Sequence, residues 1–143
     1  MYPSIFLSNV RSVFHKFDEL FAVVQNLKPC IVSITESWLN PLIPSSILDL
    51  PGYCIFRCDR TLRKGGGVCT WIRSELAPSV VSCTATAPPE IEVTWCTIFR
   101  PNMLVCSVYI PPPGLSASVH TKISDFFIQS TDDLLTYFLF FRL

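Results

Sequence analysis

Residues 30–36 read Cys-Ile-Val-Ser-Ile-Thr-Glu, and they are the clearest indication of the fold in the sequence. The first six residues form a continuous run rich in apolar and β-branched side chains. Such a run is typical of a strand that other layers cover on both faces. The run ends in the carboxylate of Glu36, so the predicted strand brings a charged side chain to the edge of a sheet.

The residues before this strand predict another strand and then a helix. Residues 4–8 form a short apolar run. Apolar side chains then recur at helical spacing from Phe14 to Leu27, with polar residues between them. We expect Ser12 to cap the start of this helix and Pro29 to end it. The chain therefore opens with a strand–helix–strand unit.

The rest of the chain alternates strand-like runs with turn signals and ends in a second helix. Prolines mark residues 40–52 as an irregular loop with a short turn at residues 45–49, and the glycines at residues 65–67 allow positive φ. The expected strands are residues 53–57, 68–73, 79–83, 92–99 and 103–110, the last two form a hairpin, and the expected helix is residues 121–137. This order predicts a single domain, residues 1–143, of the α/β class with a layered sandwich architecture.

The composition is that of a folded chain that is not secreted. Half of the 143 residues are hydrophobic and only 15% are charged, which provides apolar material for a core. The formal net charge is zero, so any contact with DNA depends on a local patch. Seven cysteines, an odd number, without a visible signal peptide favour reduced thiols and a nuclear or cytoplasmic location.

The most apolar segment is the tail, residues 134–143. It falls short of the roughly 18 apolar residues that a membrane-spanning helix needs, so we expect no membrane partner. The sequence leaves open how this tail packs.

Three polar side chains lie at or near the ends of strand-like runs: Asn9, Glu36 and Tyr109. Polar groups at strand ends of an α/β sheet converge on the edge where ligands usually bind. An amide, a carboxylate and a phenol could there serve metal-assisted chemistry on phosphate. Each also has a structural alternative, namely an Asx-turn for Asn9, a loop or helix cap for Glu36, and an amphipathic surface position for Tyr109.

Short motifs follow one another in order over most of the chain. They are Ser-Asn-Val-Arg-Ser at residues 8–12, Lys-Phe-Asp-Glu-Leu at 16–20, Leu-Lys-Pro at 27–29, Ile-Thr-Glu-Ser-Trp-Leu at 34–39, Leu-Pro-Gly-Tyr at 50–53, Arg-Cys-Asp-Arg at 57–60, Gly-Gly-Gly-Val at 65–68 and Val-Tyr-Ile-Pro-Pro at 108–112. The series resembles the endonuclease/exonuclease/phosphatase superfamily. Within it, the series is similar to the N-terminal part of non-LTR retrotransposon endonuclease domains.

The resemblance implies a chemistry and a set of partners. It implies that Asn9, Glu36 and Tyr109 are catalytic, that Glu36 binds Mg²⁺, and that the substrate is a phosphodiester bond of DNA. It also implies a larger polyprotein with a reverse transcriptase. The family's later Gly-Asp-x-Asn and Ser-Asp-His motifs are absent from the sequence. We therefore expect a truncated domain, incomplete at its C-terminus, with little or no nuclease activity alone.

A basic cluster lies beside the glycine run. It consists of Arg57, Arg60, Arg63 and Lys64, opposed only by Asp59. The pattern is compatible with contacts to the DNA backbone and equally with a solvated loop. The cluster is therefore a candidate DNA-binding site with a structural alternative.

Two tryptophans, Trp38 and Trp71, lie near these motifs. They could stack on nucleobases. We expect core packing for both, since large aromatic side chains usually contribute to cores.

Three functions stay open, so the sequence does not decide whether the chain is an enzyme. The first is a Mg²⁺-dependent DNA endonuclease of retrotransposon type. The second is a domesticated or degenerate fragment that acts as a binding module or has no function. The third is a phosphatase acting on inositol lipids or another small phosphate ester, which the Asn-Val-Arg-Ser and Thr-Glu-Ser-Trp-Leu motifs make less favoured.

Overall fold

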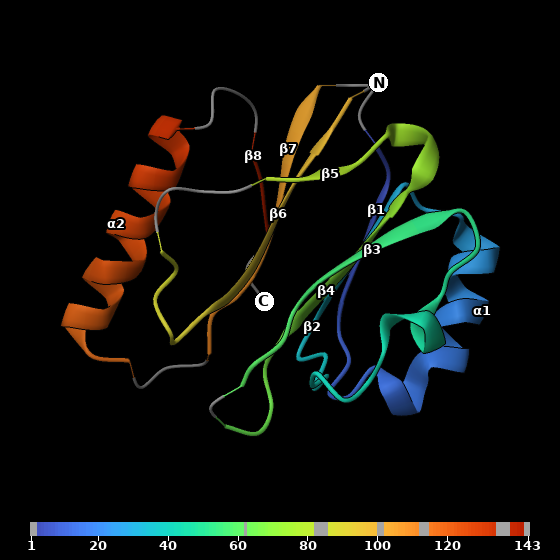
Figure 1. Cartoon of the computed structure of the whole chain (residues 1–143), viewed down its shortest axis with the longest axis horizontal. Coiled ribbons are helices and arrows are strands. Elements are labelled where there is room, and N and C mark those ends of the chain that lie inside the picture. The colour runs from blue at the N-terminus through green and yellow to red at the C-terminus, as the bar shows by residue number, and fades with distance from the viewer. Residues whose placement is uncertain are drawn as a thin grey trace.

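Two four-stranded sheets lie face to face, and one helix covers the outer face of each (Figure 1). The computed structural model describes residues 3–61, 63–81, 86–99, 102–111, 115–133 and 138–141. None of the helices in these ranges has the length and apolar character that a bilayer crossing needs. The layers run helix, sheet, sheet, helix, which confirms the predicted α/β sandwich.

The N-terminal sheet is built on the predicted strand–helix–strand unit. β1 (Ile5–Asn9) and β2 (Ile31–Thr35) are parallel neighbours, connected through α1 (Phe17–Leu27). β4 (Val68–Arg73) pairs antiparallel with β2 and with β3 (Tyr53–Cys58), so the strand order is β1-β2-β4-β3. All five residues of β2 are buried, as expected of a strand with a layer on either side.

The start of the first helix differs from the prediction. Ser12 does not cap α1, because a short 3-10 helix, η1 (Phe14–Lys16), precedes it and the N-cap residue Lys16 makes no side-chain capping bond. Ser12 instead has a φ of 79°, and its backbone N–H donates to the carbonyl of Glu36 at 3.0 Å. Ser12 thus ties the loop after β1 to the end of β2. The end of the helix before Pro29 is as predicted.

The C-terminal sheet has the order β5-β6-β7-β8. β6 (Glu92–Ile98) and β7 (Met103–Tyr109) form the predicted antiparallel hairpin, and β5 (Ser79–Val80) pairs with β6. α2 (Ala117–Asp133) follows, and β8 (Phe138–Phe141) then lies parallel to β7. The apolar tail therefore contributes a strand at the edge of this sheet.

Two predicted elements in this half have bounds that differ from the structure or extend beyond the described residues. The second helix begins at Ala117 rather than at Thr121, because the Ser116 hydroxyl accepts a hydrogen bond from the backbone N–H of Val119 and so caps an earlier first turn. Residues 134–137 of that predicted helix lie outside the described residues. The same is true of residues 82–83 in the strand predicted at residues 79–83.

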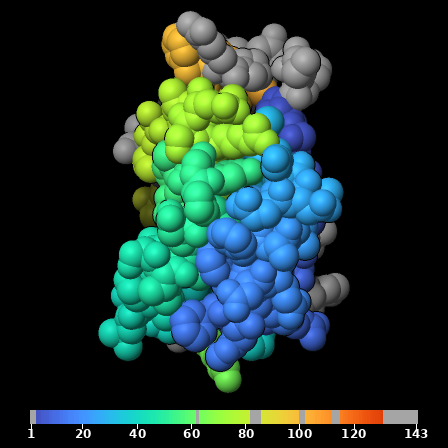
Figure 2. Space-filling model, turned by 90° about the vertical axis from the view of Figure 1, so that its right-hand side faces the viewer, coloured from blue at the N-terminus to red at the C-terminus, as the bar shows by residue number. Residues whose placement is uncertain are grey.

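The apolar core forms three layers. The layer between α1 and the N-terminal sheet contains Trp71, which is fully buried, as expected, and donates its indole N–H to the carbonyl of Leu48 at 2.9 Å. Helix α1 and the segment that contains η2 (Ser45–Leu48) cover this face of the molecule (Figure 2). A second layer lies between the sheets, and a third packs Phe126 of α2 against Trp95 of β6.

The space between the sheets also contains paired hydroxyl groups. Ser33 and Thr70 of the N-terminal sheet donate to Ser107 of β7 at 3.0 and 2.9 Å. Because buried polar groups are costly unless they are hydrogen-bonded, these bonds favour one register of the sheets on each other. Cys96, which is a free cysteine, lies in the same layer, and burial raises the pKa of its thiol to about 12.

Candidate active site at one end of the sandwich

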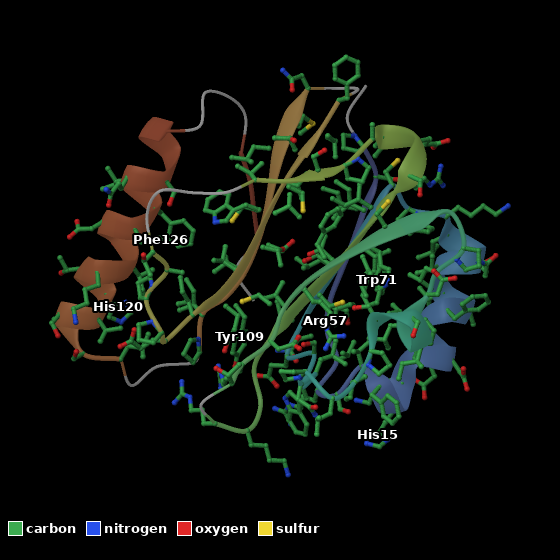
Figure 3. The ribbon with its side chains drawn as sticks, in the orientation of Figure 1. His15, Arg57, Trp71, Tyr109, His120 and Phe126 are labelled. Atoms are coloured by element: carbon green, nitrogen blue, oxygen red, sulfur yellow. The ribbon has the colours of Figure 1, made fainter. Side chains whose placement is uncertain are left out.

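One end of the sandwich collects strand ends from both sheets. In the N-terminal sheet, the last residues of β1 and β2 and the first residue of β4 are neighbours in register; they are Asn9, Thr35 and Val68. In the C-terminal sheet, Glu92 at the start of β6 pairs with Tyr109 at the end of β7. Figure 3 shows Tyr109 at this end of the sheet. The convergence places the sequence-predicted residues on one edge.

Glu36 and Tyr109 are in direct contact across the two sheets. The Tyr109 hydroxyl donates to Glu36 Oε1 at 2.8 Å, although the residues are 73 positions apart. Arg11 Nε lies 3.7 Å from Glu36 Oε2, and its side chain is 77% exposed against 18% for Glu36. Asn9 lies at the same end of the sandwich and is exposed. It pairs in register with Thr35, the residue that precedes Glu36. The structure therefore joins the carboxylate and the phenol, and it places Asn9 at the neighbouring strand end.

The backbone at Glu36 is strained. Glu36 and Trp38 have φ values of 52° and 54°, in a left-handed region that residues other than glycine rarely adopt. The glycine run holds this conformation, because the carbonyls of Gly67 and Gly66 accept the backbone N–H groups of Ser37 and Trp38 at 3.2 and 3.0 Å. Strain of this kind persists only where surrounding contacts enforce it, and it is concentrated at functional sites.

The prediction that Trp38 packs in the core is wrong, because 39% of the residue is exposed. The left-handed turn at this position carries the side chain outwards, and its indole nitrogen lies next to Gly65. The prediction failed because no local signal reveals a positive φ at a tryptophan.

The basic cluster divides into buried and exposed members. Arg57 is 14% exposed in its side chain, forms an ion pair with Asp59 at 2.6 Å, and donates to the carbonyls of Asn40 and Ile43. It braces the loop before β3 (Figure 3). Arg63 and Lys64 are exposed on the connection between β3 and β4.

Arg60 forms a nearly buried ion pair with Glu92. Arg60 Nε lies 2.5 Å from Glu92 Oε1, and the two side chains are 10% and 4% exposed. Its guanidinium carbon also lies 5.6 Å from the centre of the Tyr109 ring. The hydrogen bond to Glu92 raises the pKa of Arg60 above its ordinary value, against partial burial, which lowers it. Arg60 thus connects the loop between β3 and β4, which contains the glycine run, to the phenol of Tyr109.

Sequence reasoning gave no role to Glu92 or Arg11. Glu92 is the first residue of a strand, and nothing in its neighbourhood marks a partner 32 positions earlier. Arg11 lies within the Ser-Asn-Val-Arg-Ser motif, which could have drawn attention to it. A charged residue at the start of a largely buried strand is the one signal that could have revealed Glu92.

Tyr109 is expected to titrate far above neutral pH. Burial and the hydrogen bond to Glu36 raise its pKa from 10.0 to about 12, although Arg60 lowers it. The phenol therefore stays a proton donor, and its stabilising effect, complete below about pH 10, is lost as the pH rises through about 12. The difference in phenolate absorbance between the wild-type protein and Tyr109→Phe measures this group. A difference signal with a midpoint near pH 10 would contradict the contact with Glu36.

The residues at this edge fit a hydrated hard cation. Mg²⁺ keeps several waters and is usually held by one or two carboxylates plus substrate phosphate, so Glu36 alone can suffice. The hydroxyls of Thr35 and Ser37, on either side of Glu36, are buried without a hydrogen-bond partner in the described part of the chain. Over that same part, no three His, Cys, Asp or Glu side chains gather around a metal position. The donors present here, a carboxylate flanked by two hydroxyls, are oxygen atoms of the kind that a hard divalent cation takes.

Comparison with known proteins identifies the fold. No protein-family model and no curated protein matches the sequence. The structure is similar to an AP endonuclease from Archaeoglobus fulgidus, with a TM-score of 0.68 and 14% identity over 99% of this chain and 56% of that one. It is also similar to the 3′ phosphatase NExo from Neisseria bound to a product DNA hairpin, with a TM-score of 0.64 and 17% identity over 92% of this chain and 51% of that one.

A third similar structure carries the family name. It is an endonuclease/exonuclease/phosphatase family protein from Bacteroides thetaiotaomicron, with a TM-score of 0.62 and 13% identity over 92% of this chain and 57% of that one. The chain therefore has the endonuclease/exonuclease/phosphatase fold. It spans between half and three fifths of the length of these three structures.

Proposed function

We propose that the edge formed by Asn9, Glu36 and Tyr109 is the metal- and phosphate-binding part of a DNA phosphodiesterase site, related to the endonuclease domains of non-LTR retrotransposons. The 2.8 Å hydrogen bond between Tyr109 and Glu36 is the observation that carries this proposal. It joins strand ends of two sheets, which is where an α/β protein usually binds its ligand.

Each residue has a role that its chemistry supports. Glu36 would hold Mg²⁺, and the bound ion would neutralise negative charge on the phosphate. The Tyr109 hydroxyl remains protonated and would donate its single O–H to a phosphate oxygen in place of Glu36 once the ion occupies that carboxylate. The Asn9 amide can donate as well. The exposed Arg63 and Lys64 would contact the DNA backbone, while the more buried Arg57 and Arg60 hold the loop that carries them.

We further propose that these 143 residues alone bind the cation and phosphate with little or no hydrolysis. The resemblance assigns water activation to the Gly-Asp-x-Asn and Ser-Asp-His motifs, which the sequence lacks. The proposal includes a nuclear or cytoplasmic location and an origin in a polyprotein with a reverse transcriptase. The alternative is a domesticated or degenerate fragment that acts as a binding module or has no function.

Magnesium titration calorimetry tests the metal role. Glu36→Gln should weaken Mg²⁺ binding by roughly tenfold or more, because even partners of metal ligands contribute 10- to 100-fold to affinity. Glu19→Gln, an equal change of charge at an exposed position of α1, should leave binding unchanged. Equal affinity in the wild-type protein and Glu36→Gln would rule out this carboxylate as the ligand.

Nicking of supercoiled plasmid with Mg²⁺ tests the catalytic limit in parallel. The purified chain should convert no more plasmid than Glu36→Gln does. Metal-dependent nicking that disappears in Glu36→Gln would show that these residues are catalytically sufficient.

A further inference from the structure

A cavity of about 530 Å³ is lined by residues from the loop after β1, from the segment that follows Glu36 and from the connection between β3 and β4. Its walls include the exposed aromatic side chains of Phe14 and Trp38, which are 46% and 39% exposed. His15 lines it as well, and the His15 ring lies edge-on to Phe14 with centroids 5.2 Å apart. Flat aromatic faces at the mouth of a cavity of this size suit a planar ring.

The position of Trp38 at this cavity has a conformational cost. Its φ of 54° is a genuine outlier for a bulky residue, and two glycine carbonyls hold the turn in place. A tryptophan would normally contribute its large apolar surface to the core, as Trp71 does here. The chain instead keeps Trp38 at the surface, two residues from the proposed metal ligand. An enforced outlier at an exposed aromatic points to a ligand for that aromatic.

Charge distinguishes this cavity from its neighbour. The described lining residues include the exposed cations Arg63 and Lys64, as well as Arg60, which is paired with Glu92, and they include no carboxylate. A second cavity of about 450 Å³, which also includes Arg60 and Arg63 in its walls, is lined by Asp59, Glu90 and Glu92. A polyanion is therefore favoured in the first cavity and opposed by three carboxylates in the second.

Two of the residues that line the cavity also contact residues of the proposed phosphate site. Ser12 lines the cavity and donates its backbone N–H to the carbonyl of Glu36 at 3.0 Å. Arg60 lines it too and lies over the Tyr109 ring. A phosphate held at Glu36 and Tyr109 is thus adjacent to a cavity with aromatic walls and a positive rim.

We propose that this cavity binds an unpaired nucleobase of single-stranded DNA, stacked on Trp38 and Phe14, next to the phosphate at Glu36. This inference rests on the proposed function and specifies its substrate class. Stacking tolerates any base because every base has a π-face, and the adjoining Arg63 and Lys64 follow the backbone. A small sugar or lipid phosphate has no planar group to place there.

Binding of two labelled oligomers by fluorescence anisotropy tests the inference. One is an oligothymidylate of about eight nucleotides, within the span of single-strand sites; the other has the same length and backbone but no bases. Trp38→Ala should weaken oligothymidylate binding roughly 5- to 150-fold, the cost of losing one stacked base, and leave base-free binding unchanged. Trp38→Phe, which keeps a stacking face, should retain most of the affinity.

Matched variants separate the possible outcomes. Leu27→Ala, at the exposed apolar last residue of α1, should change neither affinity. If Trp38→Ala folds poorly, Phe14→Ala, at the other exposed aromatic residue of the lining, should give the same pattern. An equal loss for both oligomers, or a loss for neither, would overturn the base-binding role. Glu36→Gln should weaken Mg²⁺-dependent binding of both oligomers, so its failure to do so would count against the phosphate site and leave the stacking cavity intact.

Discussion

Replacing Arg60 by leucine should lower the free energy of unfolding by about 3–5 kcal/mol, as expected when one partner of a buried ion pair is removed. The loss arises because Glu92, whose side chain is 4% exposed, would keep a carboxylate without its cation in a poorly hydrated position. The cation–π contact with Tyr109 is lost as well. Urea unfolding followed by circular dichroism measures the change.

A second substitution shows whether the charge is responsible. Changing Arg60 and Glu92 to leucine together removes both charges, and replacing a whole buried pair by apolar side chains is often neutral or stabilising. The double variant should therefore recover most of the stability lost in Arg60→Leu. If the double variant is as unstable as the single one, the guanidinium contributes by packing and the ion pair is not the cause.

Replacing Trp71 by alanine should cost about 3–5 kcal/mol, the range for a large aromatic side chain in a core. Trp71 has no exposed surface, packs near Phe17, and satisfies the carbonyl of Leu48. Removing it leaves a cavity between α1 and the N-terminal sheet and an unpaired buried carbonyl. For a domain of ordinary stability this is a large fraction of the total. Thermal and urea unfolding both report it.

Trp38→Ala is the matched control. It makes the same chemical change at a tryptophan that is 39% exposed, so its effect on stability should be close to the ±0.5 kcal/mol or so typical of surface substitutions. A loss at Trp38 as large as that at Trp71 would contradict the separation of the two residues into surface and core. The same variant reports on base stacking, so folding and binding are measured on one protein.

The two ion pairs of the basic cluster, Arg57 with Asp59 and Arg60 with Glu92, decide which of its cations are free to bind a nucleic acid. Arg57 and Arg60 act within the protein, since each is paired with a carboxylate and largely covered. Arg63 and Lys64 remain exposed to a nucleic acid. Basic residues that are adjacent in the sequence thus divide into those that position the loop and those that face the ligand. This division is expected to appear as loss of stability for Arg60→Leu and as weaker binding for changes at Arg63 or Lys64.

Local patterns predicted most of the elements. The apolar run at residues 30–35 gave a strand buried on both faces, and helical spacing identified α1. The hairpin of β6 and β7 followed from two apolar runs with a short turn between them. These predictions succeeded because the spacing of apolar residues differs between helices and strands, and it records which side of each element faces a neighbouring layer.

Features that depend on contacts between distant residues escaped prediction. The cap expected at Ser12 was wrong because the backbone N–H of this residue bonds to the carbonyl of Glu36, just after the neighbouring strand β2. The exposure of Trp38 depends on glycine carbonyls from residues 66–67. The pairing of Arg60 with Glu92 joins the loop after β3 to the start of β6, which only the packed sheets bring together.

The layers, the order of the strands along the chain, and the amide, carboxylate and phenol at strand ends could all be inferred from the amino-acid sequence. The contact between the Glu36 carboxylate and the Tyr109 phenol, and the aromatic, positively charged cavity lined by Ser12, Trp38 and Arg60, became visible only in the folded molecule. Periodicity along the chain records which side of an element is buried, whereas contact between two sheets depends on how they pack face to face.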